Sequence, residues 1–136
     1  MTIKPVLAVF AGFISWWAAF YGSTAIFAAV WPALIEAGRP AIQENDWSHI
    51  TTPMLLLLLI MYLWVNPIAG WVTVRISGNR KLAWITIIPL FAYAAWAHFY
   101  NLWGLLPDWY NLIVPVIIPP LVYAGGLLVK PEKQLA

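Results

Sequence analysis

Four long apolar runs constrain what this chain can fold into. They cover about residues 6–31, 51–74, 82–104 and 110–129, and each reaches the ~20 residues that a helix needs to cross the ~30 Å hydrocarbon layer of a membrane. The strands of a membrane barrel are about half as long and alternate apolar with polar residues, which these runs do not. The sequence therefore predicts an all-α, polytopic membrane protein whose four transmembrane helices form one bundle domain over residues 1–136.

The composition agrees with a membrane protein. Hydrophobic residues make up 63% of the chain and charged residues only 9%, whereas soluble domains carry about 25% charged residues. The formal net charge of +2 is too small to indicate a nucleic-acid partner, so the lipid bilayer is the first partner expected. The chain contains no cysteine, which excludes a disulfide framework, a thiolate metal site and a cysteine nucleophile.

The basic residues predict the orientation of the bundle. Six of the seven lysines and arginines precede the first run, separate the second from the third, or follow the fourth, and only Arg39 lies in another connection. Because lysine and arginine accumulate in cytoplasmic segments, both termini are expected in the cytoplasm. Residues 32–50 and 105–109 are then expected to be loops on the outer side.

Small residues recur at helical spacing along the first run, namely Ala8, Gly12, Ser15, Ala19, Gly22 and Ala29. Helices in lipid are held together by close backbone approach at small residues and by hydrogen bonds between helices, so this stripe predicts a packing face. Asn66 in the second run lies at a depth similar to that of Ser15, counted from the cytoplasmic ends at about 1.5 Å per residue. We therefore predict a buried hydrogen bond between Ser15 and Asn66, with a substrate-binding Asn66 as the alternative.

The fourth run contains Pro115, Pro119 and Pro120, which predict a helix that is not straight. Broken helices often mark transporter sites. However, no Asp, Glu, Lys or Arg lies in the core of any run, and coupled transporters generally need such a group. The sequence also has no paired carboxylates, no Ser/His/Asp set and no metal-ligand spacing. We therefore predict no catalytic residue, no metal site and no enzyme activity, and the cofactor, if there is one, is unknown at this stage.

Four tryptophans are expected near the bilayer centre: Trp16, Trp17, Trp64 and Trp96. At that depth an indole N–H must hydrogen-bond to the protein or to a ligand. Two interpretations remain open. The four indoles form the wall of a pocket for a flat apolar molecule such as a quinone, a carotenoid or a porphyrin, or they face lipid and fill the core.

Residues 98–111, HFYNLWGLLPDWYN, place polar and aromatic side chains between two apolar runs. They predict a hairpin at the outer interface, where aromatic residues anchor the chain and polar groups meet water. By the same depth count, Tyr21 and His98 lie at a similar level, with Asn101 and Asn111 about one turn further out. We predict an outer polar cluster of these four residues, centred on His98. The alternative is a histidine hydrogen-bonded at the interface. One histidine is too few for a metal with its three or four ligands, although His49 and the loop acids Glu44 and Asp46 could complete a set.

Several motifs together resemble a known group of proteins. They are AGWVTVRI at residues 69–76, His98 followed by Leu102-Trp103, LPDWYN at residues 106–111, and a closing P-x-x-x-x-G-G-L from Pro120. The pattern resembles an uncharacterised group of small four-helix bacterial inner-membrane proteins, in which a histidine often stands at the position of Asn111. The resemblance implies the four-helix fold and the bacterial inner (cytoplasmic) membrane, and it implies no activity.

Three functions are compatible with these features. The small size and the broad aromatic faces favour a non-catalytic accessory or assembly subunit, which associates through its helices with other membrane protein subunits or with copies of itself. The alternatives are a binder of a lipophilic ligand or cofactor between helices, and a small oligomeric transporter. An enzyme acting on lipid headgroups ranks behind these three.

Overall fold

The computed structural model describes residues 3–130. The elements of this part of the chain are all helices, as the sequence predicts. The elements are α1 (Ile3–Val30), α2 (Pro32–Glu44), α3 (Thr52–Ser77), α4 (Lys81–Trp96), the short π-helix η1 (Ala97–Asn101) and α5 (Asp108–Leu127). Four segments are long and apolar enough to cross a membrane: α1, α3, α4 continued by η1, and α5. The chain is therefore built as a multi-pass membrane protein.

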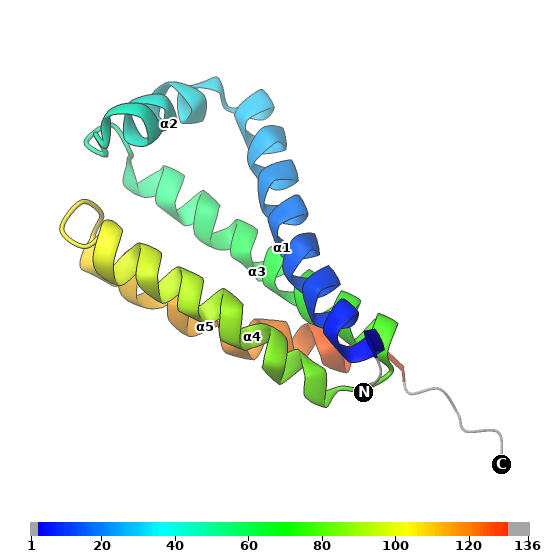
Figure 1. Cartoon of the computed structure of the whole chain (residues 1–136). Helices are drawn as coiled ribbons and strands as arrows, with labels where there is room; N and C mark the ends of the chain where they lie inside the picture. The colour runs from blue at the N-terminus through cyan, green and yellow to red at the C-terminus, as the bar shows by residue number, and fades with distance from the viewer. Residues whose placement is uncertain (1–2, 131–136) are drawn as a thin grey trace, which may run out of the picture.

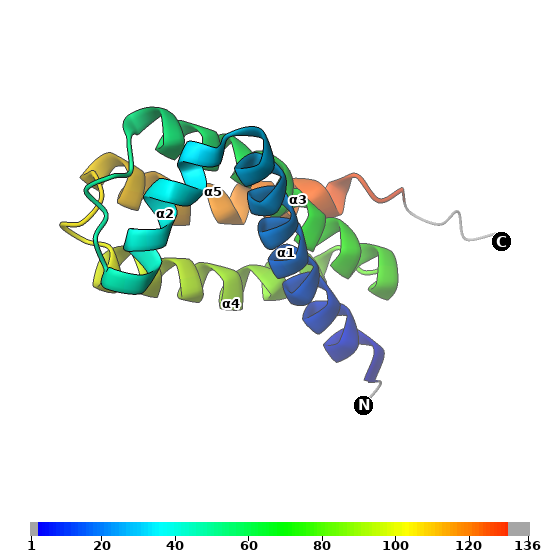
Figure 2. The same ribbon diagram turned by 90° about the horizontal axis from the view of Figure 1, so that it is seen from above.

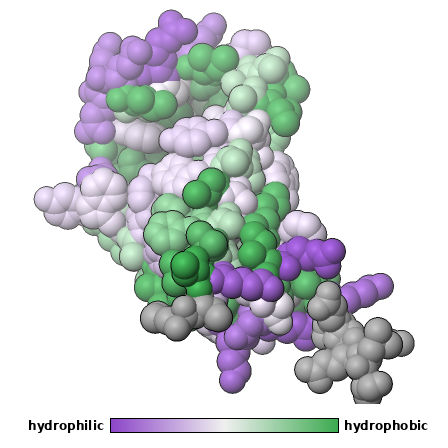
Figure 3. Space-filling view, turned by 45° about the vertical axis from the view of Figure 1, so that its right-hand side comes forward, coloured by the Kyte–Doolittle hydropathy of each residue, from purple (hydrophilic) through white to green (hydrophobic). Residues whose placement is uncertain are grey.

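The helices define two ends of the molecule. The start of α1, the α3–α4 connection and the end of α5 lie together at one end, which we call the terminal end, and α2 and the α4–α5 turn lie at the other, the α2 end (Figure 1). α3 packs on α1 and on α5, and α4 packs on α5. Toward the α2 end, α1 diverges from the other helices, and α2 crosses the opening (Figures 1 and 2). In Figure 3, hydrophilic residues gather at the two ends, and apolar and aromatic residues cover the face between them.

The backbones of α3 and α5 touch at glycines. A Cβ atom at Gly70 would overlap the backbone carbonyl of Val122, and one at Gly125 would overlap the backbone of Pro67. Close approach of this kind is how helices associate in lipid, where there is little hydrophobic force between them. These contacts hold the terminal half of the bundle tightly closed.

The small-residue stripe of α1 is a packing face over only half of its length. Ala8 and Gly12 are buried, and a Cβ atom at Gly12 would overlap the Thr73 side chain of α3. Gly22 and Ala29 are exposed, so the predicted stripe is wrong for the half of α1 nearer the α2 end. In this half α1 contacts α3 through Ser23, Thr24 and Phe27 instead, and the small residues do not lie on the packed face.

The expected outer loop after the first apolar run contains a helix that the sequence analysis missed. In α2, Leu34, Ala37 and Ala41 are buried on one face, at the three- and four-residue spacing of an amphipathic helix. The helix begins with Pro32, a favourable first residue. The internal Pro40 and the short apolar stripe make this helical pattern hard to recognise in the sequence. The pattern is typical of a surface helix and not of a membrane span.

The prolines of the fourth span do not interrupt it. α5 is continuous from Asp108 to Leu127 through Pro115, Pro119 and Pro120. The structure thus offers no broken helix of the kind that forms transporter sites within residues 3–130.

Replacement of Gly70 by alanine is expected to destabilise the protein, because the added methyl group meets the fixed backbone carbonyl of Val122. Overpacking of this kind costs about 1–3 kcal/mol. Gly22 has open space around it, so Gly22→Ala should be neutral or slightly stabilising through its helix propensity. The free energy of unfolding in mixed detergent micelles measures both changes, and equal effects would contradict the packing described here.

Candidate functional site

A cavity of about 410 Å³ lies between α1 and the other helices at the α2 end. It forms where α1 diverges from the bundle, and Ile42, Trp47 and Ile50 from α2 and the following loop line its outer side. Eight aromatic side chains line it: Trp16, Trp17, Phe20, Tyr21, Trp47, Tyr62, Tyr93 and Tyr110. Ligand sites in proteins typically measure about 300–1,000 Å³ and are mostly apolar with a few polar groups, so this cavity has the size and character of a binding site.

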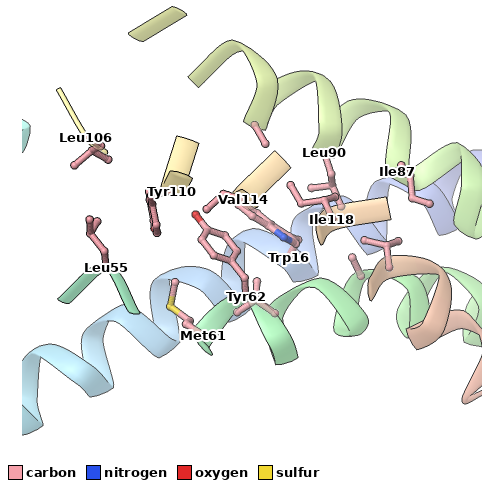
Figure 4. Packing of buried hydrophobic residues seen from close by; sticks show 14 residues of the cluster. Trp16, Leu55, Met61, Tyr62, Ile87, Leu90, Leu106, Tyr110, Val114 and Ile118 are labelled. Carbon is pink, nitrogen blue, oxygen red and sulfur yellow. The ribbon is translucent and has the colours of Figure 1, made fainter. Parts of the chain in front are cut away.

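Trp16 forms a fixed wall of this aromatic cavity. Its ring stacks on Phe20, with centroids 5.3 Å apart, and on Tyr62 at 6.3 Å. The indole Nε1 donates a 2.7 Å hydrogen bond to Oδ1 of the fully buried Asn66. Figure 4 shows the Trp16 ring near Tyr62 and Ile118. Because a hydrogen bond and two stacked rings hold the indole, the wall is formed before any ligand arrives.

The hydrogen bond predicted between Ser15 and Asn66 does not form. Ser15 Oγ donates instead to the Gly12 carbonyl within α1, at 2.8 Å, and the partner of Asn66 is the next residue, Trp16. Successive helical residues point about 100° apart, and the long indole reaches α3, while the short serine hydroxyl is satisfied by its own helix. The Nδ2 group of Asn66 is buried and has no hydrogen-bond partner among residues 3–130.

His98 lines the aromatic cavity, and Asn111, which is not a lining residue, hydrogen-bonds to its ring. His98 is 5% exposed, and its Nδ1 lies 2.9 Å from Asn111 Oδ1. Asn111 Nδ2 donates to the carbonyls of Leu102 and Leu106, each at 3.1 Å. Since the amide hydrogens are used on these carbonyls, Oδ1 faces the imidazole and the hydrogen-bond network assigns the ring proton to Nδ1. The neutral imidazole then presents Nε2 as a hydrogen-bond acceptor.

His98 lies in η1, where the helix widens. Leu102 N donates to the Ala97 carbonyl five residues earlier, at 2.9 Å, and this spacing defines a π-turn. Such turns occur frequently at functional sites. Tyr110, which the sequence analysis did not single out, packs edge-on against His98 with centroids 5.6 Å apart. Its position directly before Asn111 in the LPDWYN motif was the available signal.

The structure brings together two of the four residues of the predicted outer polar cluster. The structure joins His98 with Asn111, but Asn101 is exposed and its side chain has no hydrogen bond to a described residue. Tyr21 lines the aromatic cavity, yet it is 63% exposed and stacks on Trp17, and it forms no hydrogen bond with His98.

Of the four tryptophans expected at the bilayer centre, two line the aromatic cavity. These are Trp16 and Trp17. Trp64 donates its indole N–H to Ser23 Oγ at 2.9 Å, and Trp96 is 54% exposed. The indoles therefore divide between the two interpretations, one pair in the cavity wall and one pair outside it.

The loop after α2 carries a small polar group of its own. His49 Nε2 lies 3.4 Å from Asp46 Oδ2, and both side chains are exposed. Hydrogen bonds from the hydroxyl and the backbone N–H of Ser48 lower the pKa of Asp46. Within residues 3–130, no group of three or more His, Asp or Glu side chains is arranged to hold a metal ion.

Replacement of Asn111 by leucine is expected to destabilise the α4–α5 turn, because it leaves two carbonyls and the His98 Nδ1–H without their partner. An unsatisfied buried polar group costs about 1–3 kcal/mol. The matched variant Asn101→Leu changes an exposed residue and should shift stability by less than about 0.5 kcal/mol. Thermal unfolding in detergent measures both, and equal stability of the two variants would contradict this role of Asn111.

Comparison with known proteins identifies no relative. The chain matches no protein-family model, no curated protein sequence and no solved structure. The function is therefore inferred from the geometry of the aromatic cavity and the groups that line it.

Proposed function

We propose that the protein binds, within the membrane, a lipophilic molecule that carries a flat ring and a hydroxyl group, such as a phenol or a quinol. The observation that carries this proposal is the aromatic cavity with His98 in its wall, where Asn111 holds the histidine ring by a hydrogen bond. In this proposal the protein binds the molecule and catalyses no reaction on it. In accord with the distribution of basic residues, we also propose that the α2 end faces outward from a bacterial inner membrane and that the termini are cytoplasmic.

The walls of the aromatic cavity favour a flat ring. Trp16, Trp17 and Tyr93 present edges and faces to the same space, with the Trp17 and Tyr93 centroids 4.9 Å apart. Aromatic rings attract one another in stacked and edge-to-face arrangements, worth about 0.5–1.5 kcal/mol for each pair beyond the area buried. A ring that enters among these side chains gains several such contacts, whereas a saturated lipid chain gains none.

The hydrogen-bonding groups favour a hydroxyl on that ring. His98 Nε2 is an acceptor because Asn111 holds the proton on Nδ1, so a ligand must supply the donor. Tyr62 also lines the aromatic cavity, and Figure 4 shows its hydroxyl directed toward Tyr110 and Val114. The Tyr62 hydroxyl is a second polar group of the cavity wall, and it could bind a second oxygen atom of the ligand, as in a quinol.

The accessory or assembly role that the sequence favoured remains a prediction. It rests on exposed apolar faces, and such faces suit lipid as well as a protein neighbour. Ligand binding is the better supported function because it uses a particular cavity and a particular acceptor. A ligand-binding subunit of a larger complex would satisfy both proposals.

Filling the aromatic cavity should abolish binding. Ala97 lines it and is half-buried, whereas Ala92 lies on the exposed side of α4, outside the lining. Calorimetric titration of a long-chain alkylphenol into the purified protein in micelles is expected to show binding that Ala97→Phe weakens at least tenfold and Ala92→Phe leaves unchanged. Thermal unfolding checks that both variants stay folded. Equal binding by the two variants would place the ligand elsewhere.

The acceptor on His98 should make the protein select phenols over their methyl ethers. One hydrogen bond contributes about 0.5–1.5 kcal/mol, so the alkylphenol is expected to bind about 2- to 13-fold more tightly than the ether of equal length. In the His98→Leu variant this preference should vanish while the affinity for the ether is kept. A preference that survives the substitution would exclude His98 as the recognising group.

A further inference from the structure

We propose that a basic cleft at the terminal end binds the phosphate headgroup of an anionic phospholipid. The cleft has a volume of about 820 Å³ and is lined by five cationic residues: Lys4, Arg75, Arg80, Lys81 and Lys130. They come from the start of α1, the end of α3, the α3–α4 connection with the start of α4, and the segment after α5. Four separate parts of the chain thus direct positive charge to one place, at the opposite end from the aromatic cavity.

The charge of the basic cleft is not neutralised by the described part of the protein. Among residues 3–130 the carboxylates are Glu36, Glu44, Asp46 and Asp108, all in or next to α2 or at the start of α5. The α2 end carries them all, and none lines the basic cleft. With no carboxylate of residues 3–130 beside them, the five cations repel one another, and an anionic ligand would relieve that repulsion.

Two of the cations lie where a helix disfavours them. Arg80 immediately precedes α4 and Lys81 is its first residue. The N-terminal end of a helix carries partial positive charge, so cations there are destabilising and anions are stabilising. An anion bound between these side chains would attract both cations and also the partial positive charge of the helix N-terminus.

Arg80 gives the basic cleft a fixed point. Its Nη2 donates to the Val129 carbonyl at 3.0 Å and lies 3.5 Å from the Leu127 carbonyl, which ties the guanidinium to the end of α5. Nε and Nη1 have no hydrogen bond to residues 3–130, so they remain as donors in a fork that matches phosphate geometry. A guanidinium already held in place loses less entropy when it binds.

The setting of the basic cleft favours a lipid headgroup over free phosphate. Ile76 and Val129 line it beside the cations and are not buried, so they offer apolar surface to the first carbons of an acyl chain. The cleft lies at the ends of the spanning helices, where headgroups are located. Basic pockets between membrane helices are suited to anionic headgroups.

Native mass spectrometry of the full chain in detergent micelles tests the proposal, with phosphatidylglycerol and phosphatidylcholine of identical acyl chains added at equal concentration. Phosphatidylglycerol should be retained in preference. Each cation near a membrane surface contributes about fivefold to such binding, so the double variant R75Q/K81Q should bind phosphatidylglycerol about 25-fold more weakly. The control is R39Q, which removes a positive charge from α2 at the other end, and it should bind as the natural chain does.

Three results would overturn the assignment. Equal retention of the two lipids would show that the cleft does not recognise negative charge. Full retention of phosphatidylglycerol by R75Q/K81Q, checked for folding by thermal unfolding, would place the lipid elsewhere. Inorganic phosphate titrated alone should bind at least tenfold more weakly than phosphatidylglycerol, and equal affinity would assign the cleft to free phosphate.

Discussion

The close contact of α1 with α3 at Gly12 determines where this protein is packed and where it is hollow. A side chain at this position would overlap Thr73 and the Ala69 carbonyl, so the two helices meet there almost backbone to backbone. Helices that cross at an angle are in close contact only near the crossing. Toward the α2 end, the backbones of α1 and α3 diverge (Figure 1), and aromatic side chains line the cavity that lies there between α1 and the other helices.

Hydrogen bonds between polar side chains inside the apolar bundle join particular pairs of helices. Trp16 with Asn66 joins α1 to α3, and the buried hydroxyls of Thr73 and Thr86, 2.9 Å apart, join α3 to α4. His98 with Asn111 joins η1 to α5. Each pair is enclosed by nonpolar residues, where an unpartnered polar group is costly. The pairing also decides which atoms are left for a ligand, because Asn111 directs the imidazole proton away from Nε2.

The sequence predicts the spanning helices but not the direction in which each residue faces. Run lengths and the rise of a helix place Asn111 about one turn from the level of His98, and the structure joins the two residues. The same count places Tyr21 and Asn101 there, yet both are exposed. Depth follows from the rise per residue alone, whereas facing depends on how the helices cross, and no local pattern encodes that. A rotation of one residue, from Ser15 to Trp16, is enough to change the partner of Asn66.

The sequence analysis missed α2 for the same reason, and it left the aromatic cavity as one of two interpretations of the deep tryptophans. The apolar stripe of α2 consists only of Leu34, Ala37 and Ala41. This helix crosses the opening between α1 and the other helices, and that opening is seen only in the folded structure. A cavity depends on how the helices fit together. The sequence does not distinguish the tryptophans that line the cavity from those that lie outside it. Trp17 lines the aromatic cavity and Trp64 does not, although both are deep in the sequence-based count.

Photoaffinity labelling with a lipophilic phenol that carries a diazirine tests the central claim most directly, because it reports where in the folded protein the ligand lies. After illumination in micelles and digestion, we expect the adducts to concentrate on residues 16–21 of α1 and on residues 93–98 of α4 and η1, which border the aromatic cavity. An excess of unlabelled phenol should remove them. Adducts spread equally over lipid-facing positions such as Ile88 and Val116, which are 66% and 64% exposed, would contradict the account.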